Sequence, residues 1–238
     1  MKIESFPRKL FLFRNNLCMF AQTQNELHNM KHMSILAVSL LALVACTPEK
    51  KQEADYSQYV NPMIGTDFTG NTYPGAQVPF GMVQLSPDNG LPGWDRISGY
   101  FYPDTTIAGF SHTHLSGTGA GDLYDISFMP VTRPYKEAPA PLGIDSTFSH
   151  NDEAASAGYY RVLLKDYNIN VELTATERCG IQRYTFPEAE ASVFLNLKKA
   201  MNWDFTLDSK IEVVDSTTIR GYRLSQGWSP LQHVYFET

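Results

Sequence analysis

The stretch YYRVLLKDYNINVELTATERCGIQRYTF, residues 159–186, decides the fold class of this chain. Within it, Ile169, Val171, Leu173 and Ala175 share one parity. An apolar residue at every second position is typical of a strand that buries one face and leaves the other in water. The stretch therefore predicts β-structure.

The same alternation recurs on both sides of this stretch. Apolar positions of one parity, or short strand-like runs, occur at Met82–Leu85, Leu123–Val131, Val193-Leu195-Leu197, Ile211-Val213, Ile219 with Gly221-Tyr222, and Val234-Phe236. Toward the C-terminal end the strands and turns repeat about every ten residues, which favours a sandwich or barrel over alternating strands and helices. After residue 56 only Asn151–Ala157 is expected to form a helical turn or two. We expect an all-β fold, an antiparallel β-sandwich.

Composition bounds the possible functions. The chain has 238 residues, 43% of them hydrophobic and 18% charged, which suffices for one large domain or two small ones with an apolar core. Its formal net charge is −6. A mildly acidic chain lacks the excess of positive charge that binds a phosphate backbone, so no nucleic-acid partner is expected.

The N-terminal region has the features of a bacterial export signal. Residues 34–45 read SILAVSLLALVA, follow Lys31 and precede Cys46. This apolar run is too short to span a bilayer and has the form of a secretory signal peptide. A small residue directly before Cys46 resembles a lipobox, so we expect lipidation of Cys46. The predicted location is a bacterial cell membrane, with the protein lipid-anchored on the periplasmic side or at the cell surface.

These signals divide the chain into four parts. A start at Met30 would place a charged residue just ahead of the apolar run, so residues 1–29 are expected to be a gene-model extension. Residues 30–45 then form the lipoprotein signal peptide, and residues 46–58 a polar tether. Residues 59–238 are expected to form the β domain, incomplete at its C-terminus.

Gly and Pro are packed among aromatic residues between Tyr59 and Pro130, which indicates long loops where binding groups usually lie. One turn combines Trp94 with Asp95 and Arg96. An aromatic face beside charged hydrogen-bonding groups suits a sugar ring, with its apolar C–H face and rim of hydroxyls. The alternative is a turn whose indole packs on the domain and whose carboxylate caps it.

Two histidines follow in the string SHTH, residues 111–114. On a strand, His112 and His114 would share one face, which is half of a metal site. No further ligand follows at tight spacing, although Asp122 is near in sequence. Hydrogen-bonded structural histidines are therefore favoured, and no metal site is expected.

The string GTGAGD, residues 117–122, is superficially similar to a phosphate-binding loop. It lacks the P-loop lysine, and a strand-like pattern follows it instead of a helix, so nucleotide binding is excluded.

Seven strings together carry a resemblance to a known family: VNPMIGT (60–66), NTYPGAQVPFGMVQLSPD (71–88), SGYFYPD (98–104), IAGFSHTHLSGTG (107–119), GDLYDISFMP (121–130), ELTATERCGIQRYTFP (172–187) and GYRLSQGW (221–228). From about Tyr59 to the last residue, the chain resembles the N-terminal domain of the glycoside hydrolase family 92 α-mannosidases.

The resemblance implies a supersandwich-like N-terminal β-sandwich and a C-terminal (α/α)6 barrel, with the active site between them. It also implies a calcium-dependent, exo-acting, inverting α-mannosidase that acts on N-glycans or mannans. In the family the acid Glu, the base Asp and most calcium ligands belong to the barrel. No catalytic residue is therefore expected in this chain.

The resemblance also implies two groups of site residues. The turn that contains Trp94 is expected to contact the mannose, with the indole as an aromatic wall and Asp95 and Arg96 as hydroxyl contacts. A second group is expected to face the cleft or support the domain interface: His112, His114 and Asp122.

The last strand-like stretch, HVYFE at 233–237, ends one residue before the chain does. We therefore expect that the sequence stops before the barrel domain and is inactive alone. Two alternatives remain, a non-catalytic surface glycan-binding lipoprotein and a purely structural domain that docks a partner.

Overall fold

The computed structural model describes residues 54–117, 119–132, 144–187, 190–201 and 203–238. The predicted signal peptide, the predicted lipidation site Cys46 and residues 1–29 lie outside the described residues, as does most of the predicted tether. In the described part of the chain, no helix has the length and apolar character needed to cross a membrane.

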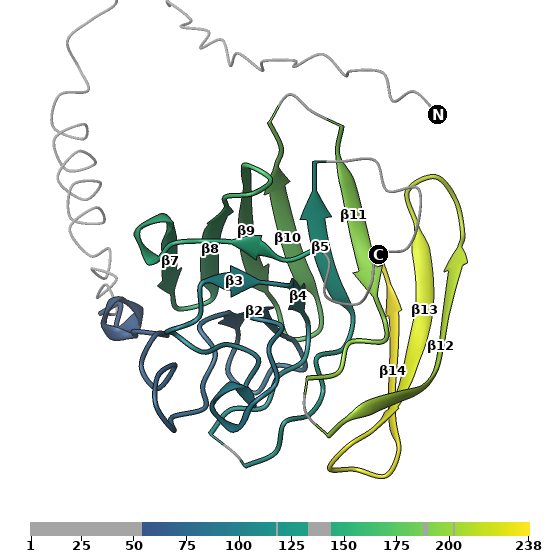
Figure 1. The fold of residues 1–238 in the computed structure, drawn as a ribbon, viewed down its shortest axis with the longest axis horizontal. Helices are drawn as coiled ribbons and strands as arrows, with labels where there is room; N and C mark the ends of the chain where they lie inside the picture. Colours follow the sequence, from purple (N-terminus) through teal and green to yellow (C-terminus); the bar gives the residue numbers. More distant parts are fainter. Residues whose placement is uncertain (1–53, 118, 133–143, 188–189, 202) are drawn as a thin grey trace, which may run out of the picture. The chain divides into compact units, whose positions relative to one another are not determined.

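The described residues form fourteen strands and three short 3-10 helices, and the strand pairs are antiparallel (Figure 1). The predicted all-β, antiparallel fold class is confirmed. The 3-10 helices are η1 (Ser57–Tyr59), η2 (Trp94–Arg96) and η3 (His150–Asp152).

Two sheets form the layers of a sandwich. The first has the order β1-β2-β4-β5-β11, with bounds Ala76–Gln77, Gln84–Asp88, Gly109–Ser111, Ser127–Val131 and Ser192–Asn196. The second has the order β10-β9-β8-β7, with bounds Gly180–Thr185, Ile169–Ala175, Tyr159–Leu164 and Glu153–Ser156. A short pair, β3 (Thr106–Ile107) and β6 (Ser146–Thr147), accompanies them.

The core lies between these two sheets. In β9, every second residue from Ile169 to Ala175 is buried, as the sequence pattern predicts. They pack with the inward side chains of β8 and with those of the first sheet, including Leu85, Phe110 and Met129. Burying a Leu, Ile or Phe side chain contributes about 1.5–3 kcal/mol, so this shared core holds the two layers together.

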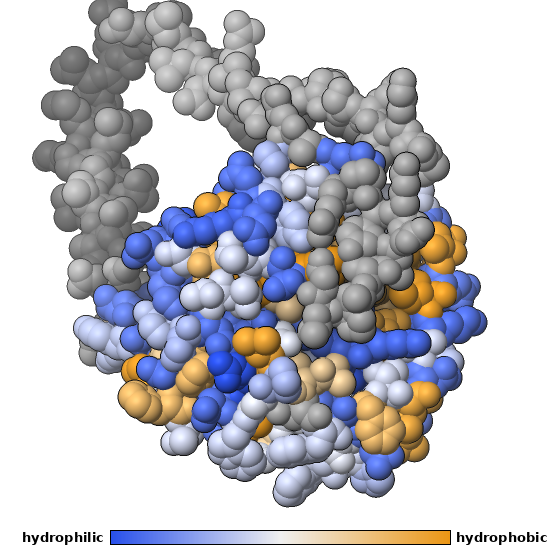
Figure 2. Space-filling view, in the orientation of Figure 1, coloured by the Kyte–Doolittle hydropathy of each residue, from blue (hydrophilic) through white to orange (hydrophobic). Residues whose placement is uncertain are grey.

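A third sheet has the order β12-β13-β14, with bounds Phe205–Val213, Ile219–Gln226 and Gln232–Glu237, and Figure 1 shows it beyond β11. The sequence pattern places the strands correctly, but the expected burial of Ile211 and Val213 is wrong. Their side chains are 46% and 72% exposed, because the shared core of the two sandwich sheets includes no residue of β12. Figure 2 shows apolar surface on the side of the molecule where Figure 1 shows β12 and β13.

Two other predicted elements differ from the structure. The strand expected over Leu123–Val131 begins only at Ser127. Leu123, Tyr124 and Ile126 have φ angles of 81°, 58° and 53°, a left-handed backbone that is incompatible with a strand.

The helical turn expected over Asn151–Ala157 is limited to η3, where the Ser149 side chain accepts a hydrogen bond from the backbone N–H of Asn151. The following residues form β7, because they pair with β8 at the edge of the second sheet.

Candidate functional site

Two exposed tryptophans lie beside the glycine-rich segment. Trp94, in η2, is 57% exposed and Trp203 is 47% exposed, and their ring centroids are 6.5 Å apart. A Cβ atom on Gly119 would lie only 3.0 Å from the Trp94 ring, so the absence of a side chain lets the segment pass against the indole. We call Trp94, Trp203 and Gly119 the tryptophan surface.

The turn below Trp94 is held by an ion pair. Arg96 donates two hydrogen bonds to the Asp104 carboxylate, at 2.6 and 2.5 Å, and its guanidinium lies 4.8 Å from the centre of the Phe101 ring. Bidentate geometry fixes the direction of the guanidinium and with it the turn. Arg96 therefore positions Trp94, and Asp95 lies partly exposed in the same turn.

Asp122 ties the glycine-rich segment to the third sheet. Its side chain is 1% exposed and accepts hydrogen bonds from the backbone N–H of Trp228 at 2.8 Å and from the Gln232 amide at 2.7 Å. Trp228, which is 79% exposed, lies in the turn between β13 and β14. The Asp122 carboxylate thus fixes the backbone of the turn that carries a third exposed indole.

The left-handed stretch after Asp122 is held by buried contacts. The Tyr124 hydroxyl donates to the Ile97 carbonyl at 2.5 Å, and the Ile126 carbonyl accepts a hydrogen bond from His112. Backbone of this kind costs about 1–3 kcal/mol per residue and persists only where its surroundings enforce it.

Arg223 is a second buried link between the third sheet and the rest of the domain, and sequence reasoning missed it. Its fully buried guanidinium forms an ion pair with Asp125. It also donates to the carbonyls of Leu123 and Lys199 at 2.9 and 2.8 Å, and to the Thr206 hydroxyl at 3.0 Å. The one available signal was an Arg within an alternating strand. Its partners Leu123 and Asp125 lie about a hundred residues away, so they leave no local sequence pattern.

His114 lies in a buried polar cluster that includes Asp88 and Lys199. Its Nδ1–H donates to the Gln84 carbonyl at 2.7 Å, and its Nε2 lies 2.8 Å from Asp88 Oδ1. Lys199 Nζ lies 2.9 Å from the other Asp88 oxygen. Burial alone would raise the pKa of Asp88, but the Lys199 and His114 charges and hydrogen bonds outweigh it and lower that pKa.

This cluster is not a hydrolytic triad. Ser111 Oγ lies 3.0 Å from the same His114 Nε2 that faces Asp88, whereas a triad needs the acid on the other ring nitrogen. Ser111 is also fully buried.

His112 faces a different part of the molecule. Its Nδ1–H donates to the Ile126 carbonyl at 2.7 Å, and its ring packs edge-on against Phe128. Burial lowers the pKa of His112, which keeps the imidazole neutral at pH 7. In the ranges that the structure covers, no group of three or more His, Cys, Asp or Glu residues is arranged to hold a metal ion.

The arrangement is suited to binding. The buried carboxylates of Asp88, Asp122 and Asp125 bind donors of the chain itself, so their role is to hold the fold in place rather than to contact a ligand. The indoles, in contrast, are exposed. Aromatic faces with nearby polar groups can accept the C–H face of a sugar ring.

Comparison with known proteins identifies the family. The profile described as "Glycosyl hydrolase family 92 N-terminal domain" matches residues 59–238. A family GH92 α-mannosidase of Bacteroides thetaiotaomicron, solved in complex with mannoimidazole, is 43% identical with a TM-score of 0.72, and the match covers 76% of this chain and 24% of that protein.

Two further relatives match over similar lengths. A GH92 family glycosyl hydrolase named ccman5 is 27% identical with a TM-score of 0.67, over 77% of this chain and 26% of that one. An "uncharacterized secreted glycosidase" of the fungus Arthroderma benhamiae is 27% identical over 68% of this chain and 21% of its own length. The chain spans about a quarter of the length of these relatives. By its match over residues 59–238, this chain belongs to glycosyl hydrolase family 92 and contains the family's N-terminal domain.

Proposed function

We propose that this chain supplies the N-terminal, carbohydrate-site-shaping domain of a calcium-dependent exo-α-mannosidase, which hydrolyses α-mannosidic bonds of N-glycans or mannans with inversion. The observation that carries the proposal is the exposed Trp94 ring, set against Trp203 over Gly119 in a chain of this family. The mannosidase names of the solved relatives support the substrate class.

In this proposal Trp94 is the aromatic wall that packs against the C–H face of a mannose ring. Arg96 keeps the wall in place through Asp104. Asp95, adjacent to the indole, accepts hydrogen bonds from sugar hydroxyls, and N–H groups of Arg96 donate to them. We assign His112, His114 and Asp122 to the support of the domain interface, through their hydrogen bonds to other parts of the chain.

The chemical step needs groups from elsewhere in the whole enzyme. Inversion requires a general acid and a general base about 6.5–9.5 Å apart, so that a water fits beside the anomeric carbon. We assign both to a C-terminal (α/α)6 domain. Calcium prefers six to eight oxygen ligands. The described residues offer no such cage, so no step of this domain is assigned to calcium.

The proposal includes export and a lipid anchor at Cys46 on a bacterial membrane. It is supported by the apolar run at 34–45, which ends directly before Cys46. The name of the fungal relative, a secreted glycosidase, agrees with export.

The test uses tryptophan fluorescence and a mannose-release assay on the purified chain. We expect α-mannotetraose to change the fluorescence, Trp94→Ala to weaken that binding about tenfold, and no mannose to be released. The control is Tyr56→Ala, which removes an aromatic ring that is 73% exposed in another part of the chain. Unchanged affinity in Trp94→Ala would contradict the role of the wall, and released mannose would contradict the assignment of catalysis to another domain.

A further inference from the structure

The third sheet has an aromatic and charged groove on the face opposite Arg223. Side chains alternate along a strand, so Tyr222 and Arg223 point to opposite faces of β13. Arg223 is buried toward the sandwich, whereas Tyr222 faces the groove. The groove has a volume of about 430 Å³, within the range of small-ligand sites.

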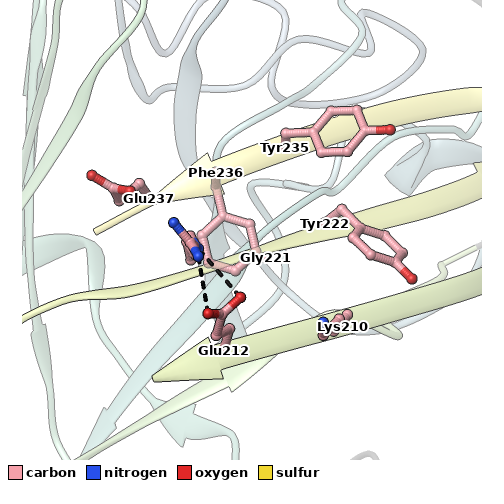
Figure 3. Close-up of a pocket in the computed structure, with 8 residues that line it drawn as sticks. Lys210, Glu212, Gly221, Tyr222, Tyr235, Phe236 and Glu237 are labelled. Carbon is pink, nitrogen blue, oxygen red and sulfur yellow. Dashed lines mark hydrogen bonds and ion pairs between the residues drawn. The ribbon is translucent and has the colours of Figure 1, made fainter. Parts of the chain in front are cut away.

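Strand register builds the groove from two cross-strand rows. One row is Lys210, Tyr222 and Tyr235, and the other is Glu212, Arg220 and Glu237. In Figure 3 the two tyrosines lie toward one end of the groove, and Glu212 and Glu237 lie toward the other. Aromatic rings and planar charged groups therefore lie side by side on one surface.

The aromatic row is partly fixed before any ligand arrives. The rings of Tyr222 and Tyr235 are 6.0 Å apart with an interplanar angle of 54°, and Tyr235 is 69% exposed. The Tyr222 hydroxyl donates to Asp208 at 2.9 Å. Two tilted rings with one hydroxyl tethered form an open, V-shaped aromatic surface.

The charged row is paired. Arg220 donates to both oxygens of Glu212, at 2.9 and 3.3 Å, and this contact lowers the pKa of the carboxyl. With Lys210 and Glu237 included, the groove carries two positive and two negative charges. A balanced set of this kind favours neither polyanions nor polycations, and it offers both donors and acceptors to hydroxyl groups.

We propose that this tyrosine groove, formed by the two rows, is a glycan-binding surface for a neutral oligosaccharide. The apolar face of a sugar ring would pack on Tyr235 and Tyr222, and its hydroxyls would hydrogen-bond to Glu212 and Arg220. The inference adds a second surface to the chain and does not require that the tryptophan surface bind sugar.

The test is gel retardation of the full chain in native gels that contain yeast α-mannan or barley β-glucan, with heparin as an anionic probe. The experiment is run in the Trp94→Ala background, so that retardation by the tryptophan surface is reduced. We expect retardation by a neutral polysaccharide, a roughly tenfold loss in Tyr235→Ala, and its preservation in Tyr235→Phe, which keeps the ring.

Tyr59→Ala is the matched control, because this side chain is 77% exposed and distant in sequence from the groove. The proposal would be overturned if Tyr235→Ala were retarded as strongly as its Trp94→Ala parent in the mannan and glucan gels. So would the absence of retardation by either polysaccharide, or retardation by heparin alone. The proposed function is judged separately by the effect of Trp94→Ala on tetraose binding in the Tyr235→Ala background.

Discussion

Arg223 and Asp125 form an ion pair across 98 residues of sequence, and both side chains are fully excluded from solvent. Asp125 also accepts a hydrogen bond from the Thr113 hydroxyl at 2.7 Å. The pair joins the third sheet to the segment that follows the glycine-rich loop. The link is therefore polar and directional, which fixes the position of the sheet more narrowly than apolar contact alone.

Replacing Arg223 with Met should lower the free energy of unfolding by about 3–5 kcal/mol, because Asp125 would remain buried without its partner. Urea denaturation followed by circular dichroism measures the change. Arg220→Met is the matched control on the same strand, since its ion pair with Glu212 is exposed to water, where such pairs contribute little to stability. Equal losses in the two variants would show that the buried pair has no special role.

The lowered pKa of Asp88 makes the free energy of unfolding depend on pH. Its pKa is lowered from 3.8 in the folded state, so it stabilises the fold above that pH and loses the contribution as the pH falls through the folded value. We expect the free energy of unfolding to decline below about pH 4, and Asp88→Asn to be less stable at neutral pH with a shallower acid decline. Urea titrations between about pH 7 and pH 3 measure both. Parallel curves for the two proteins would refute the assignment.

Gly119→Ala should disturb sugar binding more than folding. The new methyl group would lie 3.0 Å from the Trp94 ring and displace it, whereas the loop is exposed. We expect a stability change within about 0.5 kcal/mol, with a shifted tryptophan emission and weaker α-mannotetraose binding.

Gly117→Ala separates backbone strain from crowding. Gly117 has a φ of 68°, and a Cβ atom there would meet nothing within 4 Å. This variant should cost about 1 kcal/mol of stability through backbone strain and leave the Trp94 emission unchanged. The reverse pattern would mean that Gly119 does not support the indole.

Cys46→Ser should release the protein from the membrane of a bacterial host, because the lipid would have no attachment site. Fractionation and metabolic labelling with a radioactive fatty acid measure the effect. Cys179→Ser is the control, since Cys179 is an exposed free cysteine in the β domain. Labelling that persists in Cys46→Ser would rule out the proposed anchor.

The sequence predicted the fold class well where burial is local. In β9 the alternation from Ile169 to Ala175 reports directly on the core, because every second side chain is buried. Ile211 and Val213 show the same alternation on an edge strand, where it does not produce burial.

The candidate site was predicted only in part. Trp94 was visible as an aromatic residue in a turn, and the structure places it at an exposed surface. Trp203 lies about a hundred residues from Trp94, and Arg223 lies about a hundred residues from Leu123 and Asp125, so no spacing rule connects them. The left-handed backbone at Ile126 was also hidden, because β-branched residues rarely adopt it.

That left-handed backbone bears on the order in which parts of the chain fold. A free peptide of residues 123–126 would relax to ordinary dihedral angles, since each strained residue costs about 1–3 kcal/mol. Only Arg223, Ile97 and the other buried partners hold the stretch, and these arrive from distant parts of the chain. The stretch can therefore adopt its left-handed backbone only once Arg223 has reached it, so we expect the loop beside it to take its native shape late in folding.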